Sequence, residues 1–210
     1  MKAKKLTVLV LLFVFMVPIG TVSHEYGHII VAKYLGYSTK LHYGSMNLIR
    51  KDKNYSKDTR IEKTDHHSFL ITLGGPIQTI LTGSIGFFLI LYRKQKGKHL
   101  KLGSLNWLLI FLSLFWLREV FNLIISFVSE IINPDGSYFG GDEAWISDYL
   151  GLNRGVIPIS LGLIGSAIFL FIFFKILPTK VRVPFVFACV VGCLLGYYLW
   201  MYLLGPKILP

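Results

Sequence analysis

Acidic residues and cysteine are both scarce in this chain of 210 residues. Asp and Glu together occupy 11 positions against 22 for Lys and Arg, which gives a formal net charge of +11. The two cysteines, Cys189 and Cys193, lie inside an apolar run with the i,i+4 spacing that could hold a metal, but buried packing thiols are the better interpretation. No disulfide framework is predicted, and the chain shows no internal repeat.

Charged residues of either sign are also few, and long apolar runs take their place. Only 16% of the residues are charged, 53% are hydrophobic, and the mean hydropathy of +0.58 is rarely reached by soluble domains. Basic residues in excess can indicate nucleic-acid binding, but basic loops beside membrane helices explain them here, so no nucleic-acid partner is expected. We predict an all-α, multi-pass protein of the lipid bilayer, located in a bacterial cell membrane.

The apolar pattern predicts about five transmembrane helices in a single membrane domain. Several runs exceed about 18 largely uncharged residues, the length that crosses the hydrocarbon core. The loop at 36–67 is polar, and its start, from Lys40 to Ile49, alternates loosely around Gly44, which would suit a short surface hairpin. The expected helices lie at about 6–35, 69–92, 105–132, 156–177 and 183–204.

The first apolar segment also has features of a secretory signal peptide. Three lysines precede an apolar run that ends near Gly20, and residues 21–23 form a tolerable cleavage site. Apolar residues resume at Ile29, however, so the segment is long enough to span a membrane with tilt. We therefore predict that it is a retained transmembrane helix.

The most informative stretch is His24-Glu25-Tyr26-Gly27-His28, near the end of this first segment. On a helix the two histidines share one face, so both imidazoles can reach one metal ion, with Glu25 close to a water molecule at that ion. This is the H-E-x-x-H arrangement, in which two histidines hold zinc and the glutamate acts as general base. Polar side chains are costly in lipid, which favours a functional site over a chance match.

An open zinc site needs a third protein ligand, and the loop after the third helix offers several acids. That loop is expected on the same membrane side as the end of the first helix, because three successive spans alternate in direction. Asp142, which follows two glycines, is the preferred candidate, and Asp135 of the Asp135-Gly136 turn is the alternative. Glu143 and Glu130 are further candidates, and all four would also be ordinary as turn acids.

Two further features of the membrane segments bear on the site. Gly74, Gly75 and Pro76, expected near the start of the second helix, would interrupt its hydrogen bonding and form a wall that holds an extended substrate; close helix packing is the alternative. Arg118 and Glu119 are adjacent in the third segment and cannot simply pair with each other, so each is expected to find a partner on another helix or to face a water-filled cavity. A structural role is predicted for both.

The distribution of basic residues bears on the orientation of the chain. The lysines at the amino terminus, the loop from Arg93 to Lys101 and the turn at Lys180 favour an inside amino terminus, which puts the end of the first helix outside. The loop at 36–67 is also basic and argues for the reverse. We predict the inside amino terminus.

Taken together, these residues resemble the site-2 protease family of intramembrane zinc metalloproteases, as a short, divergent member, over about residues 6–150. The histidine motif matches the family's first motif, and Gly75-Pro76 matches the Gly-Pro of its second, although Thr79 stands where that motif has Asn. Asp135-Gly136 fits the letters of the third motif, with Pro134 in place of its usual Leu, while Gly141-Asp142 fits a variant pattern. No peptide-binding insert is visible.

The resemblance implies a three-helix metalloprotease core and the hydrolysis of a membrane protein or peptide substrate. Zinc on His24, His28 and Asp142 would lower the pKa of a water molecule, Glu25 would take its proton, and Gly74, Gly75 and Pro76 would contact the substrate. Two other functional hypotheses stay open. One is a non-catalytic metal-binding scaffold or transporter, and the other is a membrane zinc protease of the prenyl-protein type that uses Glu143 or Glu130 as ligand.

Overall fold

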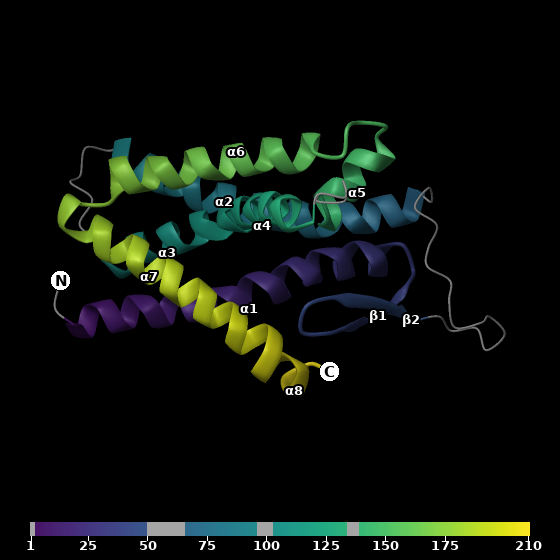
Figure 1. Ribbon diagram of the computed structural model, residues 1–210, viewed down its shortest axis with the longest axis horizontal. Helices are drawn as coiled ribbons and strands as arrows, with labels where there is room; N and C mark the ends of the chain where they lie inside the picture. Colours follow the sequence, from purple (N-terminus) through teal and green to yellow (C-terminus); the bar gives the residue numbers. More distant parts are fainter. Residues whose placement is uncertain (1–2, 50–65, 96–102, 134–138) are drawn as a thin grey trace.

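The computed structural model describes residues 3–49, 66–95, 103–133 and 139–210. Within these residues, five helices are long and apolar enough to cross a membrane. They run alternately in opposite directions and lie side by side as a bundle (Figure 1). The prediction of a mainly helical chain with about five helices suited to cross a membrane is confirmed. The five spans are Ala3–Tyr34, His66–Gln95, Ser104–Ser129, Val156–Ile176 and Thr179–Ile208.

Several spans are composed of more than one element. The first two are the single helices α1 (Ala3–Tyr34) and α2 (His66–Gln95). The third joins α3 and α4 through a 3-10 turn, the fourth ends in a π-helical turn, and in the fifth a π-helical turn joins α7 to α8. Their bounds are α3 Ser104–Ser113, η1 Leu114–Trp116, α4 Leu117–Ile132, α6 Val156–Phe171, η2 Ile172–Ile176, α7 Thr179–Tyr198, η3 Leu199–Leu204 and α8 Gly205–Ile208.

Helix α1 is the element around which the bundle is packed, with α7 on one side and α2 on the other. Glycines allow both approaches. A Cβ on Gly192 of α7 would collide with the Val10 carbonyl oxygen, and one on Gly196 with the Val14 carbonyl oxygen. Small residues at such crossings let membrane helices gain close van der Waals contact. Deeper in the bundle, the fully buried rings of Phe13 and Phe185 meet edge to face at 5.3 Å.

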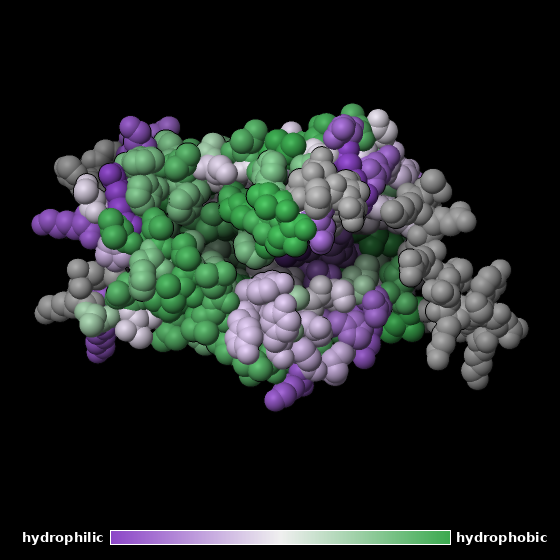
Figure 2. All heavy atoms as spheres, in the orientation of Figure 1, coloured by the Kyte–Doolittle hydropathy of each residue, from purple (hydrophilic) through white to green (hydrophobic). Residues whose placement is uncertain are grey.

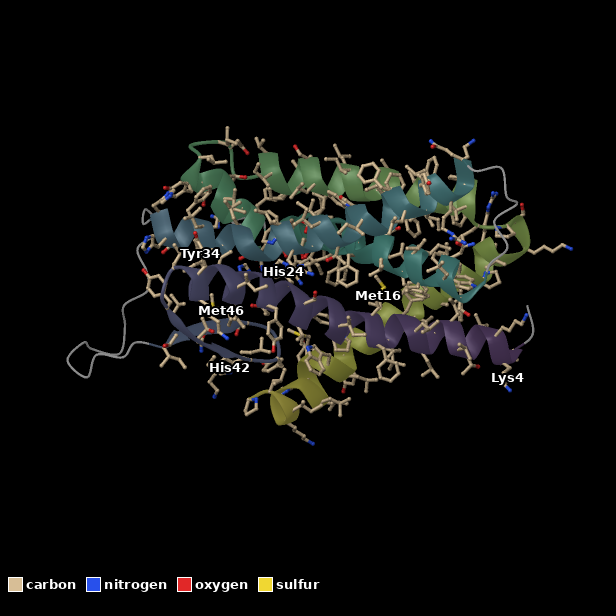
Figure 3. The ribbon with its side chains drawn as sticks, turned by 180° about the vertical axis from the view of Figure 1, so that it is seen from behind. Lys4, Met16, His24, Tyr34, His42 and Met46 are labelled. Carbon is tan, nitrogen blue, oxygen red and sulfur yellow. The ribbon has the colours of Figure 1, made fainter. Side chains whose placement is uncertain are left out.

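A short β-hairpin follows α1, in the region where the sequence suggested one. Strands β1 (Ser38–Leu41) and β2 (Met46–Ile49) pair antiparallel, with Ser38 opposite Ile49. The hairpin lies beside the half of α1 that runs from His24 to Tyr34, as Figure 3 shows.

The surface of the bundle is largely apolar, as a lipid-facing surface should be. Figure 2 shows hydrophobic residues over much of one face and hydrophilic residues toward its two ends. Between α4 and the hairpin the same face is hollowed, and the floor of the hollow is hydrophilic. A polar depression within an apolar surface indicates a functional site in this region.

Candidate metal centre

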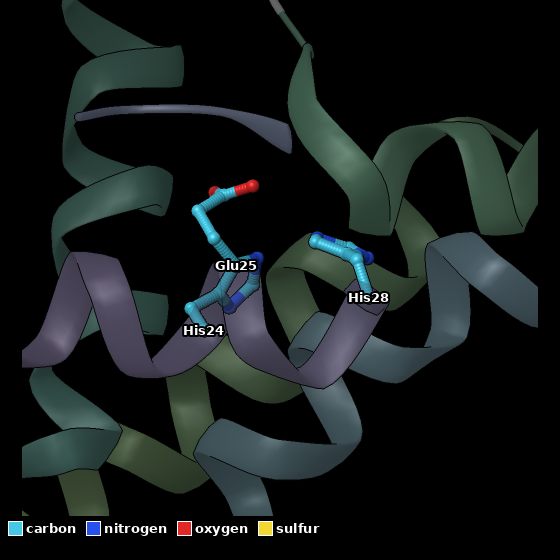
Figure 4. Close-up of side chains that lie close together, drawn as sticks. All are labelled: His24, Glu25 and His28. Atoms are coloured by element: carbon cyan, nitrogen blue, oxygen red, sulfur yellow. The ribbon is translucent and has the colours of Figure 1, made fainter. Parts of the chain in front are cut away.

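Helix α1 presents the first part of the site. His24, Glu25 and His28 are all buried, with exposed fractions of 0%, 7% and 6%. Because the two histidines are one helical turn apart, their rings lie 4.8 Å from each other. Each of the three residues offers a ligand atom, and these atoms all lie within 4.8 Å of one another (Figure 4).

Asp142 completes the cluster from the short helix α5 (Gly141–Tyr149). Its Oδ2 lies 2.8 Å from His24 Nε2 and 3.2 Å from His28 Nε2, so one carboxylate oxygen contacts both imidazoles. Gly141, with φ of +80°, takes a left-handed conformation that glycine readily adopts, and this turn starts α5 directly before the carboxylate. The three residues preferred as ligands from the sequence therefore meet at one point.

The other acids considered from the sequence are not in this position among the residues that the structure describes. Glu143 is 2% exposed and its carboxyl group interacts with that of Glu119 on α4. Glu130 belongs to α4, but its side chain is not among those described. Asp135 and Gly136 lie outside the described residues, so the alternative third ligand stays a prediction.

Each imidazole is fixed through the ring nitrogen that faces away from Asp142. His24 Nδ1 lies 2.9 Å from the Thr79 hydroxyl, and His28 Nδ1 lies 2.8 Å from the Ile71 carbonyl oxygen, both on α2. Such outer contacts set the tautomer and orientation of a ligating histidine. Thr79, which replaces the Asn of the resembling motif, thus has a contact of its own that the sequence did not suggest.

Gly74, Gly75 and Pro76 lie inside α2, not at its start, because the helix begins at His66. All three are buried against α1. A Cβ on Gly75 would collide with both imidazole Nε2 atoms, and one on Gly74 with the Gly27 carbonyl oxygen. These residues therefore serve close helix packing, the alternative considered from the sequence, and their contact with a substrate stays a prediction.

Helix α2 continues through Pro76 and also lends backbone groups to the site. The N–H of Gly75, which would bond only to Ile71 in a regular helix, also lies 3.2 Å from His28 Nδ1. Ile71 O and Gly75 N therefore both face the imidazole of His28.

The two acids of α5 differ in electrostatic environment. Burial raises the pKa of Asp142, but the hydrogen bonds from His24 and His28 outweigh this effect and hold the pKa well below its usual range. Burial and then the charge of Asp142 raise the pKa of Glu143. Asp142 is thus kept as an anion beside the two imidazoles, while Glu143 is favoured in its neutral form.

These donors fit a zinc ion. Two imidazole nitrogens and one carboxylate oxygen leave a fourth position open, which is the donor set of a catalytic zinc site. Tetrahedral ligands at about 2.0–2.2 Å from zinc are separated by roughly 3.3 Å. The distances of 2.8 and 3.2 Å between Asp142 and the imidazoles come close to that separation.

No protein-family model, no curated protein and no solved structure matches this chain. A functional assignment therefore depends on the geometry of the site itself.

Proposed function

We propose that this chain is a zinc-dependent intramembrane endopeptidase that hydrolyses a peptide bond of a membrane-embedded or membrane-proximal protein. One observation carries the proposal. A carboxylate 118 residues further along the chain contacts the Nε2 atoms of both histidines of an H-E-x-x-H motif inside an apolar helix. Such a set of polar groups costs free energy within lipid, so its presence in a membrane span indicates a functional site.

In this mechanism His24, His28 and Asp142 hold the metal, and Glu25 moves the proton. Zinc, when bound, would supply Lewis-acid activation of a water molecule and of the peptide carbonyl. The Glu25 carboxylate takes a proton from the attacking water and then delivers it to the nitrogen of the leaving amine. The backbone of Met46 in β2 lies beside the Glu25 carboxyl group, so the hairpin helps to position the base.

Substrate access fits the shape of the molecule. The hollow between α4 and the hairpin has a hydrophilic floor and apolar surroundings (Figure 2). A peptide from the bilayer would enter there and would need to unwind locally, because a helical peptide bond is shielded by its neighbours. Gly74, Gly75 and Pro76 are the backbone that we propose lies near the bound segment.

The decisive experiment compares zinc content and cleavage in the purified full chain. Glu25→Gln should keep about one zinc per chain and lose cleavage of a detergent-solubilised transmembrane peptide by at least about 100-fold, because the proton acceptor is gone. His24→Ala and Asp142→Asn should lose the zinc. Asp148→Asn is the matched control, since Asp148 is an acid of the same helix that pairs with Arg154 at 3.7 Å.

Two outcomes would overturn the proposal. A wild-type protein that is free of zinc after purification in a zinc-containing buffer would show that the chain does not bind this metal. Unchanged cleavage in Glu25→Gln would show that Glu25 is not the general base and would favour a non-catalytic metal-binding scaffold or transporter. Against a prenyl-protein type of protease with Glu143 as ligand, the Glu143 carboxyl group faces Glu119, whereas the Asp142 carboxylate contacts both imidazoles.

A further inference from the structure

Arg118 is a cation in the third membrane span. Among the described residues its side chain has no hydrogen-bond or ion-pair partner. It lies in the first turn of α4, half-buried, and its Nε is enclosed without a hydrogen-bond partner. The ion pairs found in the described part of the chain do not include it. A guanidinium placed within a bilayer-spanning segment normally pairs with a carboxylate or backbone carbonyls, so its isolation requires a reason.

The other arginines that the structure describes show what a structural arginine looks like in this molecule. Arg93 donates to Asn106 Oδ1 at 2.8 Å. Arg182 donates to two backbone carbonyl oxygens, at 2.7 and 3.1 Å, and Arg154 pairs with Asp148. Each is anchored by a protein acceptor. Of the two surroundings predicted for Arg118, a hydrogen-bond or ion-pair partner on another helix is not found among the described residues, and a water-filled cavity stays a prediction.

The charge of Arg118 acts on the metal centre. Its guanidinium interacts electrostatically with His24 and Glu25 on α1. Glu119 and Glu143 are also within its range, but these two carboxyl groups interact with each other and do not form an ion pair with it. The cation therefore lies within electrostatic range of the reacting groups, and no hydrogen bond or ion pair among the described residues occupies its guanidinium.

We propose that Arg118 is a further catalytic residue, which binds the carbonyl oxygen of the scissile peptide bond as negative charge develops on it. This inference rests on the proposed peptidase function. As the water oxygen bonds to the carbonyl carbon, one water proton passes to Glu25 and the carbonyl π electrons move to the oxygen, where the guanidinium N–H groups donate to them. When the C–N bond breaks, the carbonyl re-forms and Glu25 protonates the leaving nitrogen. Arginine suits this role because it stays charged at every working pH.

The test uses two probes with the same peptide backbone and tetrahedral phosphorus that differ in charge. One is a peptide phosphinate with alanine on either side of the tetrahedral phosphorus, and the other is its neutral methyl ester. In the zinc-loaded full chain, Arg118→Gln should bind the phosphinate at least about tenfold more weakly than wild type, with the ester and the zinc content unchanged, because one charge-assisted donor is lost. Arg93→Gln, which removes an arginine anchored elsewhere, is the matched control and should leave both affinities unchanged.

The outcomes separate this proposal from the peptidase assignment. If wild type holds zinc and cleaves peptide but Arg118→Gln binds the phosphinate as tightly as wild type, the role of Arg118 is overturned alone. If wild type holds no zinc, the zinc analysis shows that the peptidase proposal itself has failed. Should Arg118→Gln not fold, Arg118→Met decides, because it also removes the charge and the donors: weaker phosphinate binding with unchanged ester binding supports the role of Arg118, and wild-type affinity for both probes overturns it.

Discussion

Gly75 shows how strictly single residues are constrained at the centre. It is buried on α2 directly against the two imidazoles, and the space that a Cβ would need is already taken by both Nε2 atoms. These are the atoms that would bind the metal, so they cannot move aside without loss of the site. Glycine is thus required here for space, because Gly75 sits within a helix.

We therefore expect Gly75→Ala to weaken zinc binding at least tenfold, roughly the effect of disturbing the support of a metal ligand. Zinc affinity measured by competition with a chromogenic chelator checks this. Gly20→Ala on α1 is the control, because a Cβ there meets nothing within 4 Å. Equal zinc affinity in the two variants would contradict the expectation.

Thr79 acts on the metal through His24. Its hydroxyl is 1% exposed and is the contact of His24 Nδ1. Thr79→Val keeps the shape and removes the hydroxyl, so zinc affinity should fall by about 10–100-fold while the helix content stays the same. Thr7→Val, which removes an exposed hydroxyl of α1 that bonds to the Ala3 carbonyl, should leave zinc affinity as it is. A fall as large in Thr7→Val would show that the effect is not specific to the site.

At the level of elements, the hairpin is fixed between α1 and the last span. The Trp200 indole N–H donates to the Tyr43 carbonyl oxygen at 2.8 Å, and the Tyr43 N–H donates to the Leu209 carbonyl oxygen at 3.0 Å. A Cβ on Gly205 would collide with Tyr43, so α8 also lies close to the turn of the hairpin. The strand that reaches Glu25 through Met46 is thereby tied to the fifth span.

Trp200→Phe should loosen this attachment. The lost hydrogen bond is worth about 1 kcal/mol, so amide hydrogen exchange in Tyr43–Met46 should quicken roughly fivefold. Mass spectrometry of the exchanged, proteolysed protein measures this, and zinc content should not change. Trp107→Phe is the control, because Trp107 packs against Phe111 and Phe185 in the core. Unaltered exchange in the hairpin of Trp200→Phe would show that the attachment contributes little.

At the scale of the whole molecule, the alternating spans put the hairpin and α5 at one end and the α6–α7 turn at the other (Figure 1). His24 lies about 15 Å of helix from Tyr34, so the centre is some way below the membrane surface. The basic residues at the amino terminus and at Lys180 favour the cytoplasm for the second end. The site would then open toward the outer side.

Cysteine labelling tests this orientation. In a background with Cys189 and Cys193 changed to alanine, Ser45→Cys in the hairpin turn should react with a membrane-impermeant maleimide on intact cells. Lys180→Cys at the start of α7 should react only after the cells are opened. Both positions are exposed, so the contrast reports membrane side and not burial. The reverse pattern would place the amino terminus outside.

Local patterns sufficed for much of this protein. Hydropathy over about 20 residues is a property of contiguous sequence, so the spans could be predicted. The spacing of His24 and His28 likewise placed two imidazoles on one helix face, whatever the rest of the chain does. Alternating spans also brought the acidic loop to the correct membrane side, but no local rule could choose among its four candidates.

Distances between segments far apart in the chain could not be predicted from local patterns and follow from the packing of the helices. This packing brought Asp142 to both imidazoles, supplied Thr79 and the Ile71 carbonyl as their outer contacts, and turned Glu119 toward Glu143 instead of toward an arginine. Each of these depends on how helices cross and rotate against one another, which is set by packing at positions such as Gly27 and Gly74. Hydrophobicity drives helices into the membrane, but steric fit between them determines which polar side chains meet there.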